Sequence, residues 1–275
     1  MRAPEPTARA ALKDELAAIV REAGALAASL RGDRLKFWTK HHDSPVSEAD
    51  IAVDGLLRER LTRLMPDCAW LSEETEDDRT RLGAARLWVV DPIDGTRAYV
   101  NGRTDWAISV ALVEHGRPVA GAVFAPMEDG LYLATAGEGA TREGVALAAD
   151  TSDSLDQARA AGPKPMLAEL AGAAPRIVPL PKVHSLALRL ARVAAGKIEI
   201  AFASKGSHDW DLAAADIIVQ EAGGALTSLE GAITRYNSAE ARHGALIAAG
   251  LARHRRALAI TRAWPPHGAL RGSMA

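Results

Sequence analysis

Hydrophobic residues recur at three- and four-residue intervals in two segments near the start of the chain. The first segment covers residues 8–30 and predicts one amphipathic helix. The second follows Ser47 and ends near Pro66. Ser47 and Asp50 have the spacing of a capping box, in which each side chain accepts a hydrogen bond from the backbone N–H group of the other residue. The second helix is therefore predicted to begin directly after Ser47.

Short apolar runs then replace the helical spacing. Residues 87–91, 106–113, 118–125 and 131–139 are predicted strands. The tetrapeptide Glu-His-Gly-Arg joins the second and third of these runs, so we expect them to form an antiparallel hairpin.

The span 136–182 is rich in Ala, Gly and Pro and has no clear period. We therefore place a boundary between two subdomains within it. Residues 1–150 are predicted to form an α+β subdomain, and residues 151–275 an α/β subdomain.

Helix and strand patterns alternate after this span. Predicted helices cover residues 185–196, 209–224 and 251–264, and predicted strands cover residues 198–203 and 244–250. An α+β half followed by an alternating α/β half predicts helices and sheets stacked in layers.

Composition indicates the class of protein and of partner. Of the 275 residues, 48% are hydrophobic, which predicts a globular chain with a sizeable core. The formal net charge of −2 argues against a nucleic-acid polymer or a membrane surface as the partner. The N-terminus lacks the pattern of a signal peptide, and no apolar run approaches the ~20 residues that span a bilayer. The single cysteine, Cys68, excludes an internal disulfide, and together these features predict a cytoplasmic protein without integral membrane contact.

The stretch DPIDGT, residues 91–96, directly follows an apolar run. A carboxylate at the end of a buried strand is costly unless a positive charge compensates it. Pro92 restricts the backbone between Asp91 and Asp94, so the turn can direct both carboxylates and the Ile93 carbonyl group at one point. Two metal ions about 4 Å apart that share Asp91 would provide the compensating charge.

Other acidic residues lie at predicted junctions between elements. Asp50 opens a helix, Glu73 and Glu74 follow an apolar run, and Asp211 lies in the first turn of the 209–224 helix. Carboxylates without neighbouring His or Cys partners favour Mg²⁺ or Mn²⁺ over zinc. Two other interpretations stay open, because acidic residues are common helix caps and the run EETEDD also suits a solvated face.

Gly95 and Thr96 have properties that are expected of a phosphate-binding site. Glycine permits close approach of the backbone, and N–H groups at the start of a helix attract an anion. The Thr96 hydroxyl group can contact an attacking water. The sequence therefore predicts a site that holds metal ions beside a small anionic phosphate ester.

The stretches DPIDGT, LSEE and WDLAAADIIVQEAGG together resemble the inositol monophosphatase superfamily of Mg²⁺-dependent, lithium-sensitive phosphatases. The block DSPVSEAD at residues 43–50 stands in the matching order before them. The resemblance implies an α-β-α-β-α sandwich, of mixed α/β and α+β class, and hydrolysis of phosphate monoesters with two or three Mg²⁺ ions, which Mn²⁺ can replace. Relatives often form dimers, so it also implies a homodimer.

The resemblance implies the metal ligands. Glu73, Asp91 and the Ile93 carbonyl group correspond to ligands of a first ion. Asp91, Asp94 and Asp211 correspond to ligands of a second ion. Glu73 also corresponds to a ligand of a third, more weakly bound ion.

The resemblance also implies the catalytic and substrate residues. Thr96 and Asp50 correspond to the pair that orients and deprotonates the attacking water, with Glu73 as a further catalytic residue. Phosphate is expected to bind the backbone N–H groups of Gly95 and Thr96. The full set of expected substrate contacts is Asp94, Gly95, Thr96, Asp211, Ser185 and Lys205.

Details of the motifs favour one branch of the superfamily. SPVSEAD and LSEE resemble the 3′(2′),5′-bisphosphate nucleotidases of the CysQ type, which act in sulfate assimilation. Ser204 stands where inositol phosphatases carry a glutamate that recognises sugar hydroxyl groups. Adenosine 3′,5′-bisphosphate, converted to AMP and phosphate, is therefore the expected substrate.

Alternatives to this substrate stay open. A Ser-Arg-Ser-His-like stretch is missing after residue 150, and histidinol-phosphate phosphatases share DPIDGT, as do inositol-1-phosphatases. A protein of another class, a phospho-ligand sensor without catalysis, would not need Thr96 and Asp50. By position, Arg189 and Lys205 are candidates for contacts with a second phosphate, and Lys40 is a candidate for the first.

Overall fold

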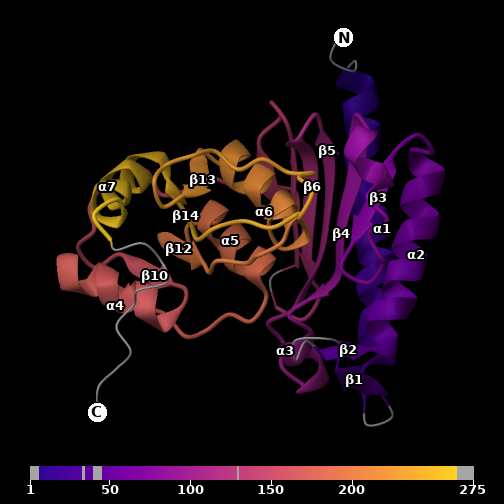
Figure 1. The fold of residues 1–275 in the computed structure, drawn as a ribbon, viewed down its shortest axis with the longest axis horizontal. Helices are drawn as coiled ribbons and strands as arrows, with labels where there is room; N and C mark the ends of the chain where they lie inside the picture. Colours follow the sequence, from indigo (N-terminus) through magenta and orange to yellow (C-terminus); the bar gives the residue numbers. More distant parts are fainter. Residues whose placement is uncertain (1–5, 33–34, 40–44, 129, 265–275) are drawn as a thin grey trace.

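Helices and sheets alternate in five layers in the computed structural model, which describes residues 6–32, 35–39, 45–128 and 130–264 (Figure 1). A helix pair, α1 and α2, covers a seven-stranded sheet, and a second pair, α5 and α6, separates that sheet from a five-stranded one. A third pair, α4 and α7, covers the outer face of the smaller sheet. The α-β-α-β-α sandwich is thus confirmed. The helices of these three pairs are α1 (Pro6–Leu30), α2 (Glu48–Leu64), α4 (Lys164–Ala173), α5 (Leu186–Ala194), α6 (Asp209–Glu221) and α7 (Leu251–Thr261).

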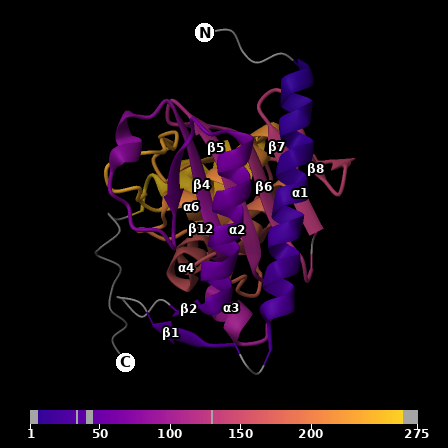
Figure 2. The same cartoon turned by 90° about the vertical axis from the view of Figure 1, so that its right-hand side faces the viewer.

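The larger sheet has the strand order β3-β4-β5-β6-β7-β8-β9. Only β3 and β4 run parallel, and each later pair is antiparallel. Figure 2 shows α1 and α2 side by side across this sheet. The strands are β3 (Ala69–Ser72), β4 (Arg86–Asp94), β5 (Ala107–Glu114), β6 (Arg117–Ala125), β7 (Gly130–Thr135), β8 (Ala140–Arg142) and β9 (Val145–Ala146).

Alternate side chains of β4 enter different cores. Leu87 and Val89 pack in the cluster that contains α5 and α6, whereas Trp88 and Val90 pack in the cluster that contains α1 and α2. A strand buried on both faces is a continuous apolar run. This explains why an acidic residue directly after the run is unusual.

The smaller sheet has the strand order β11-β10-β12-β14-β13. Ala201 and Ala203 of β12 face the central helices, while Ile200 and Phe202 face α4 and α7. Short elements outside these layers are the antiparallel strands β1 (Phe37–Thr39) and β2 (Pro45–Ser47), the 3-10 helix η2 (Thr80–Gly83) and helix α3 (Thr96–Val100). The strands of the smaller sheet are β10 (Arg159–Ala161), β11 (Val178–Pro179), β12 (Ile200–Ala203), β13 (Gly224–Ser228) and β14 (Leu246–Gly250).

The predicted long elements are present. The span 136–182, which has no clear period, contains the ten-residue helix α4 and several strands of two or three residues. The strands have too few residues to display a period, whereas α4 was missed despite its length. Strand β13 begins at Gly224, where the sequence predicted only the end of a helix. All strands of the larger sheet precede residue 150 and all strands of the smaller one follow it, but the division into subdomains stays a prediction.

Within the described ranges, none of the helices has the length and apolar character needed to cross a bilayer.

Candidate active site

The DPIDGT stretch begins as part of strand β4. Asp91 pairs with Ser109 of β5, and Asp94 pairs with Ala107, with an irregularity in the register between them. This irregularity leaves Pro92, which has no N–H group to donate, outside the regular ladder. The N–H group of Ile93 donates to Oδ1 of Asp91 over 3.0 Å, which fixes the orientation of that carboxylate.

Three carboxylates meet where β4 ends and α6 begins. Oxygen atoms of Asp91, Asp94 and Asp211 lie within 4.8 Å of one another. Asp211 occupies the first turn of α6, where its Oδ2 accepts the backbone N–H of His208 over 2.7 Å. The helix start therefore orients Asp211 toward the end of the strand.

The electrostatic environment of these carboxylates favours a bound cation. Burial raises the pKa of Asp91 well above its ordinary value, and the nearby charges of Glu73 and Asp94 raise it further. Burial, followed by the charge of Asp94, raises the pKa of Asp211 to about 7. In the described part of the chain, no Lys or Arg forms an ion pair with Asp91. Clustered carboxylate oxygens without His or Cys are the donor set that Mg²⁺ and Mn²⁺ prefer, so these residues fit such ions.

Glu73 lies beside the three clustered carboxylates. Strand β3 runs parallel to β4 with Ser72 opposite Val90, and the N–H of Glu73 donates to the Val90 carbonyl over 3.3 Å. Glu73 is thereby the neighbour of Asp91 on the adjacent strand. After burial, its charge is the largest cause of the raised pKa of Asp91.

Thr96 and Asp50, the pair that the resemblance implies, are in direct contact, while their shared role stays a prediction. The Thr96 hydroxyl group lies 3.1 Å from Oδ1 of Asp50 and 3.0 Å from the Ile93 carbonyl oxygen. The other oxygen of Asp50 accepts the N–H and the hydroxyl of Ser47 over 2.8 and 2.5 Å. The predicted capping box is confirmed, and it orients Asp50 toward Thr96.

Asp94 is held by the start of α5. Its Oδ2 accepts the Ser185 hydroxyl and the Ala187 N–H, each over 2.6 Å. The same Ser185 hydroxyl accepts the N–H of Leu188 over 3.0 Å, so it caps α5 and binds Asp94 at once. The structure thus shows Ser185 orienting a carboxylate, while its contact with substrate stays a prediction.

Gly95 connects β4 to α3 with a backbone that favours glycine. Its φ of +92° lies in the left-handed region, and a Cβ there would stand 3.0 Å from the backbone nitrogen of Ser185. The close approach of the two segments therefore depends on the missing side chain.

Three cationic residues were predicted to contact phosphate groups of the substrate. Lys205 is exposed in the turn between β12 and α6. Arg189 is partly buried, and its guanidinium group donates to the carbonyl oxygens of Phe202 and Val183 over 3.0 and 2.7 Å, so its contact with a second phosphate stays a prediction. Lys40 lies outside the described residues.

Arg242, which no motif in the sequence indicated, lies beside His208 at the start of α6. Arg242 donates from Nε to Nε2 of His208 over 2.9 Å, and Nδ1 of His208 is 3.9 Å from Asp211. The His208 ring also stacks on Trp210, with centroids 4.3 Å apart. Burial and the charge of Arg242 lower the pKa of His208 to about 4, so the ring is neutral at neutral pH. An isolated β-bridge between residues 208 and 242, together with hydrogen bonds between residues 206–209 and 241–243, brings this arginine close.

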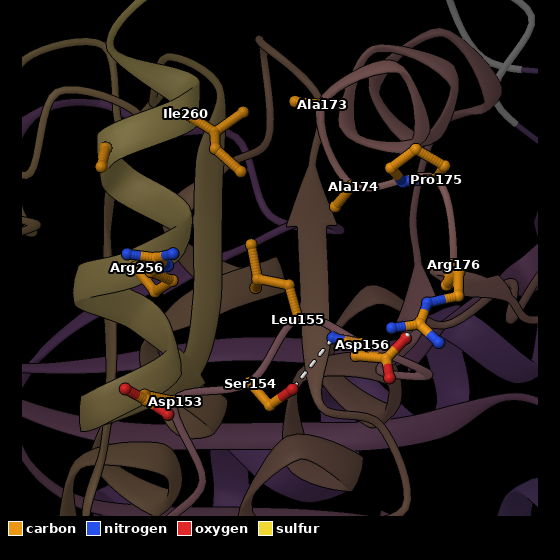
Figure 3. A pocket seen from close by; sticks show the side chains of 11 residues that line it. Asp153, Ser154, Leu155, Asp156, Ala173, Ala174, Pro175, Arg176, Arg256 and Ile260 are labelled. Atoms are coloured by element: carbon orange, nitrogen blue, oxygen red, sulfur yellow. Dashed lines mark hydrogen bonds and ion pairs between the residues drawn. The ribbon is translucent and has the colours of Figure 1, made fainter.

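A cavity of about 780 Å³ lies elsewhere, between α4, α7 and the segment that precedes β10 (Figure 3). Small apolar residues line much of it, and its Asp156 is paired with Arg176 over 2.7 Å. Volume alone does not identify a catalytic site, and the clustered carboxylates are not among the residues that line this cavity.

Sequence relatives cover most of the chain. An inositol-1-monophosphatase of Rhizobium meliloti (strain 1021) is 34% identical over 235 residues, which are 82% of this chain and 88% of that protein. A histidinol-phosphatase of Mycobacterium tuberculosis is 38% identical over 208 residues, 72% of this chain and 79% of that protein. The similarity to the 3′(2′),5′-bisphosphate nucleotidase CysQ of Escherichia coli (strain K12) is 37% identity over 101 residues, only 36% of this chain and 41% of that protein.

Solved structures and the family profile agree with these matches. The extragenic suppressor protein suhB of Bartonella henselae has a TM-score of 0.81 at 25% identity, covering 92% of this chain and 99% of that one. A Thermotoga maritima IMPase has a TM-score of 0.80 at 26% identity, covering 90% of this chain and 96% of that one. The profile described as the inositol monophosphatase family matches residues 7–263. The chain therefore belongs to the inositol monophosphatase family and is a metal-dependent hydrolase of phosphate monoesters.

Proposed function

We propose that this chain binds two or three Mg²⁺ ions through Glu73, Asp91, the Ile93 carbonyl oxygen, Asp94 and Asp211. The observation that carries the proposal is the meeting of three carboxylates within 4.8 Å beside the Thr96–Asp50 pair. The ions, when bound, neutralise the phosphoryl oxygens and make water more acidic. Mn²⁺ has the same preference for oxygen ligands and is expected to replace Mg²⁺.

The catalytic roles follow from the hydrogen bonds of Thr96. Its hydroxyl group donates to Asp50, so its lone pairs are available to accept a proton of the attacking water. Asp50 then takes up the proton that Thr96 passes on, because its carboxylate is already fixed by Ser47. The N–H groups of Gly95 and Thr96, at the start of α3, bind the phosphate of the substrate.

Adenosine 3′,5′-bisphosphate is the substrate that we propose. Ser204 and Lys205 in the turn before α6, and Arg242, which donates to His208, are all exposed, whereas a polyol site would gain from a carboxylate that accepts from hydroxyl groups. Two cationic side chains suit a second anionic group on the substrate. The match to CysQ proteins covers only part of the chain, so this proposal depends mainly on these residues.

Histidinol phosphate is the second candidate, and inositol 1-phosphate the third. The match to a histidinol-phosphatase over 208 residues favours the second candidate, and the match to an inositol-1-monophosphatase over 235 residues favours the third. Dimerisation stays a prediction.

A phosphate-release assay on these three substrates and fructose bisphosphate tests the proposal. We expect the highest kcat/KM for adenosine 3′,5′-bisphosphate, no release without Mg²⁺, and inhibition by Li⁺. A higher kcat/KM for histidinol phosphate or inositol phosphate would reject the nucleotidase activity. Phosphate release unaffected by EDTA would reject the role of the ions.

A further inference from the structure

We propose that Asp54 is a positioning residue that holds Glu73 at the metal cluster. The proposal rests on the metal-binding role proposed above for Glu73. Asp54 lies four residues after Asp50 on α2, so both side chains are on the same face of the helix. It is 8% exposed, and the described residues provide it with no Lys or Arg ion pair.

Both oxygens of Asp54 bind the segment that carries Glu73. The Ser72 hydroxyl donates to Oδ1, and the Thr75 hydroxyl donates to Oδ2 over 3.0 Å. The Ser72 oxygen in turn accepts the N–H of Glu74 over 3.2 Å. One carboxylate therefore anchors the chain both before and after Glu73.

Further contacts restrict the movement of the segment that Asp54 binds. The indole N–H of Trp70 donates to the Thr75 hydroxyl oxygen over 3.2 Å, and Ser72 is opposite Val90 in the sheet. Helix α2 thus contacts the site at two points, through Asp50 on Thr96 and through Asp54 on both sides of Glu73. Residues that bind and orient a metal ligand typically contribute about 10- to 100-fold to metal affinity or activity.

The chain offers a matched control in Asp216. This buried carboxylate on α6 also accepts hydroxyl groups, from Thr234 over 2.6 Å and Tyr236 over 2.8 Å. Its hydrogen bonds reach the segment after β13 and not the segment around Glu73. A loss of stability without a loss of metal affinity is therefore expected for Asp216→Asn.

Binding of Mn²⁺ to the full chain, stripped of metal with EDTA, tests the proposal. The EPR signal of free Mn²⁺ gives the affinity without substrate, so the result is independent of hydrolysis. We expect the affinity of the tightest sites to fall about tenfold in Asp54→Asn and severalfold in Thr75→Val, and to stay unchanged in Asp216→Asn. If Asp54→Asn does not fold, the Mn²⁺ affinity of Thr75→Val still tests the proposal, because that variant keeps the hydrogen bond between Ser72 and Asp54.

A double-mutant cycle separates positioning from a general structural role. In a Glu73→Gln background, Asp54→Asn should produce no further loss of Mn²⁺ affinity. Unchanged affinity in the single variants, an equal loss in Asp216→Asn, or fully additive losses with Glu73→Gln would each overturn the proposal. A chain that binds Mn²⁺ but hydrolyses none of the phosphate esters would reject the proposed function and leave this test intact.

Discussion

The placement of Asp91 and Asp211 beside other negative charges costs stability, but it provides ligands for catalytic metal ions. Asp91 is buried and Asp211 is partly buried, both lie close to other negative charges, and their raised pKa values reflect that cost. Neither is needed to complete the hydrophobic core. Their positions are explained by a bound cation, which converts the repulsion between them into shared coordination.

Asp91→Asn and Asp211→Asn should therefore separate activity from stability. We expect kcat/KM to fall about a thousandfold or more, because bound ions supply several kcal/mol of transition-state stabilisation. The melting temperature of the metal-free protein should stay unchanged or rise, since a repulsive charge is removed. Kinetics and thermal melts in EDTA measure both effects. Activity like that of the wild type in either variant would contradict the assignment.

Gly95→Ala tests the backbone at the start of α3. A left-handed conformation costs a non-glycine residue about 1–2 kcal/mol, and the new Cβ would also meet the Ser185 backbone at 3.0 Å. Gly144 is the control, because its φ is +78° and nothing lies within 4 Å of an added Cβ. Urea unfolding should show a larger loss for Gly95→Ala than for Gly144→Ala. Equal losses would mean that the close approach to Ser185 has no energetic effect.

At the scale of elements, the site lies where β3, β4 and the starts of α5 and α6 converge. Each element is fixed by its own packing, and each contributes one or two polar residues. The start of α5 is the least obvious of these, because its cap, Ser185, also binds Asp94. A helix terminus thereby orients a carboxylate of the cluster.

Ser185→Ala should weaken this junction. Loss of an N-cap costs about 1 kcal/mol, and loss of a donor to a buried carboxylate adds to that value. We expect a decrease of about 1–3 kcal/mol in the free energy of unfolding, together with a higher Mg²⁺ concentration for half-maximal activity. Urea titration and activity against Mg²⁺ concentration provide the two measurements. A variant with unchanged stability would show that the cap is dispensable.

At the scale of the whole molecule, the acidic cluster links stability to pH and to metal. The pKa of Asp211 is about 7 in the folded protein, compared with an ordinary value of 3.8. Between these values the folded state binds more protons than the unfolded state, so stability falls as pH rises. Bound cations remove this penalty, because they replace the protons.

The metal-free protein should therefore melt at a lower temperature at pH 8 than at pH 5.5. Added Mg²⁺ should raise the melting temperature more at pH 8 than at pH 5.5, because protons compete with the ion at the lower pH. Thermal melts with EDTA or Mg²⁺ at both pH values measure this. In Asp211→Asn the pH dependence should be smaller, and a dependence equal to that of the wild type would argue against the cluster as its cause.

The fold was predictable where the sequence carries long periods. The helices α1 and α2 and the hairpin of β5 and β6 have enough residues to show a 3.6- or two-residue repeat. The short strands β8 to β11 do not, and they form only because neighbouring strands supply their hydrogen-bond partners. The hydrogen bonds of Arg189 to two backbone carbonyl groups were also unpredictable, because a charged side chain gives no local sign of such partners.

Local sequence was enough to predict the chemistry of the site, since clustered carboxylates before Gly-Thr suit divalent ions and phosphate. It also determined where α2 begins, because a capping box depends on residues three positions apart. Only the tertiary structure brought Asp211 to within 4.8 Å of Asp91, Arg242 to His208, and Asp54 to Ser72 and Thr75. The physical reason is that local spacing governs helices and turns, whereas contacts between distant segments depend on how buried faces pack together.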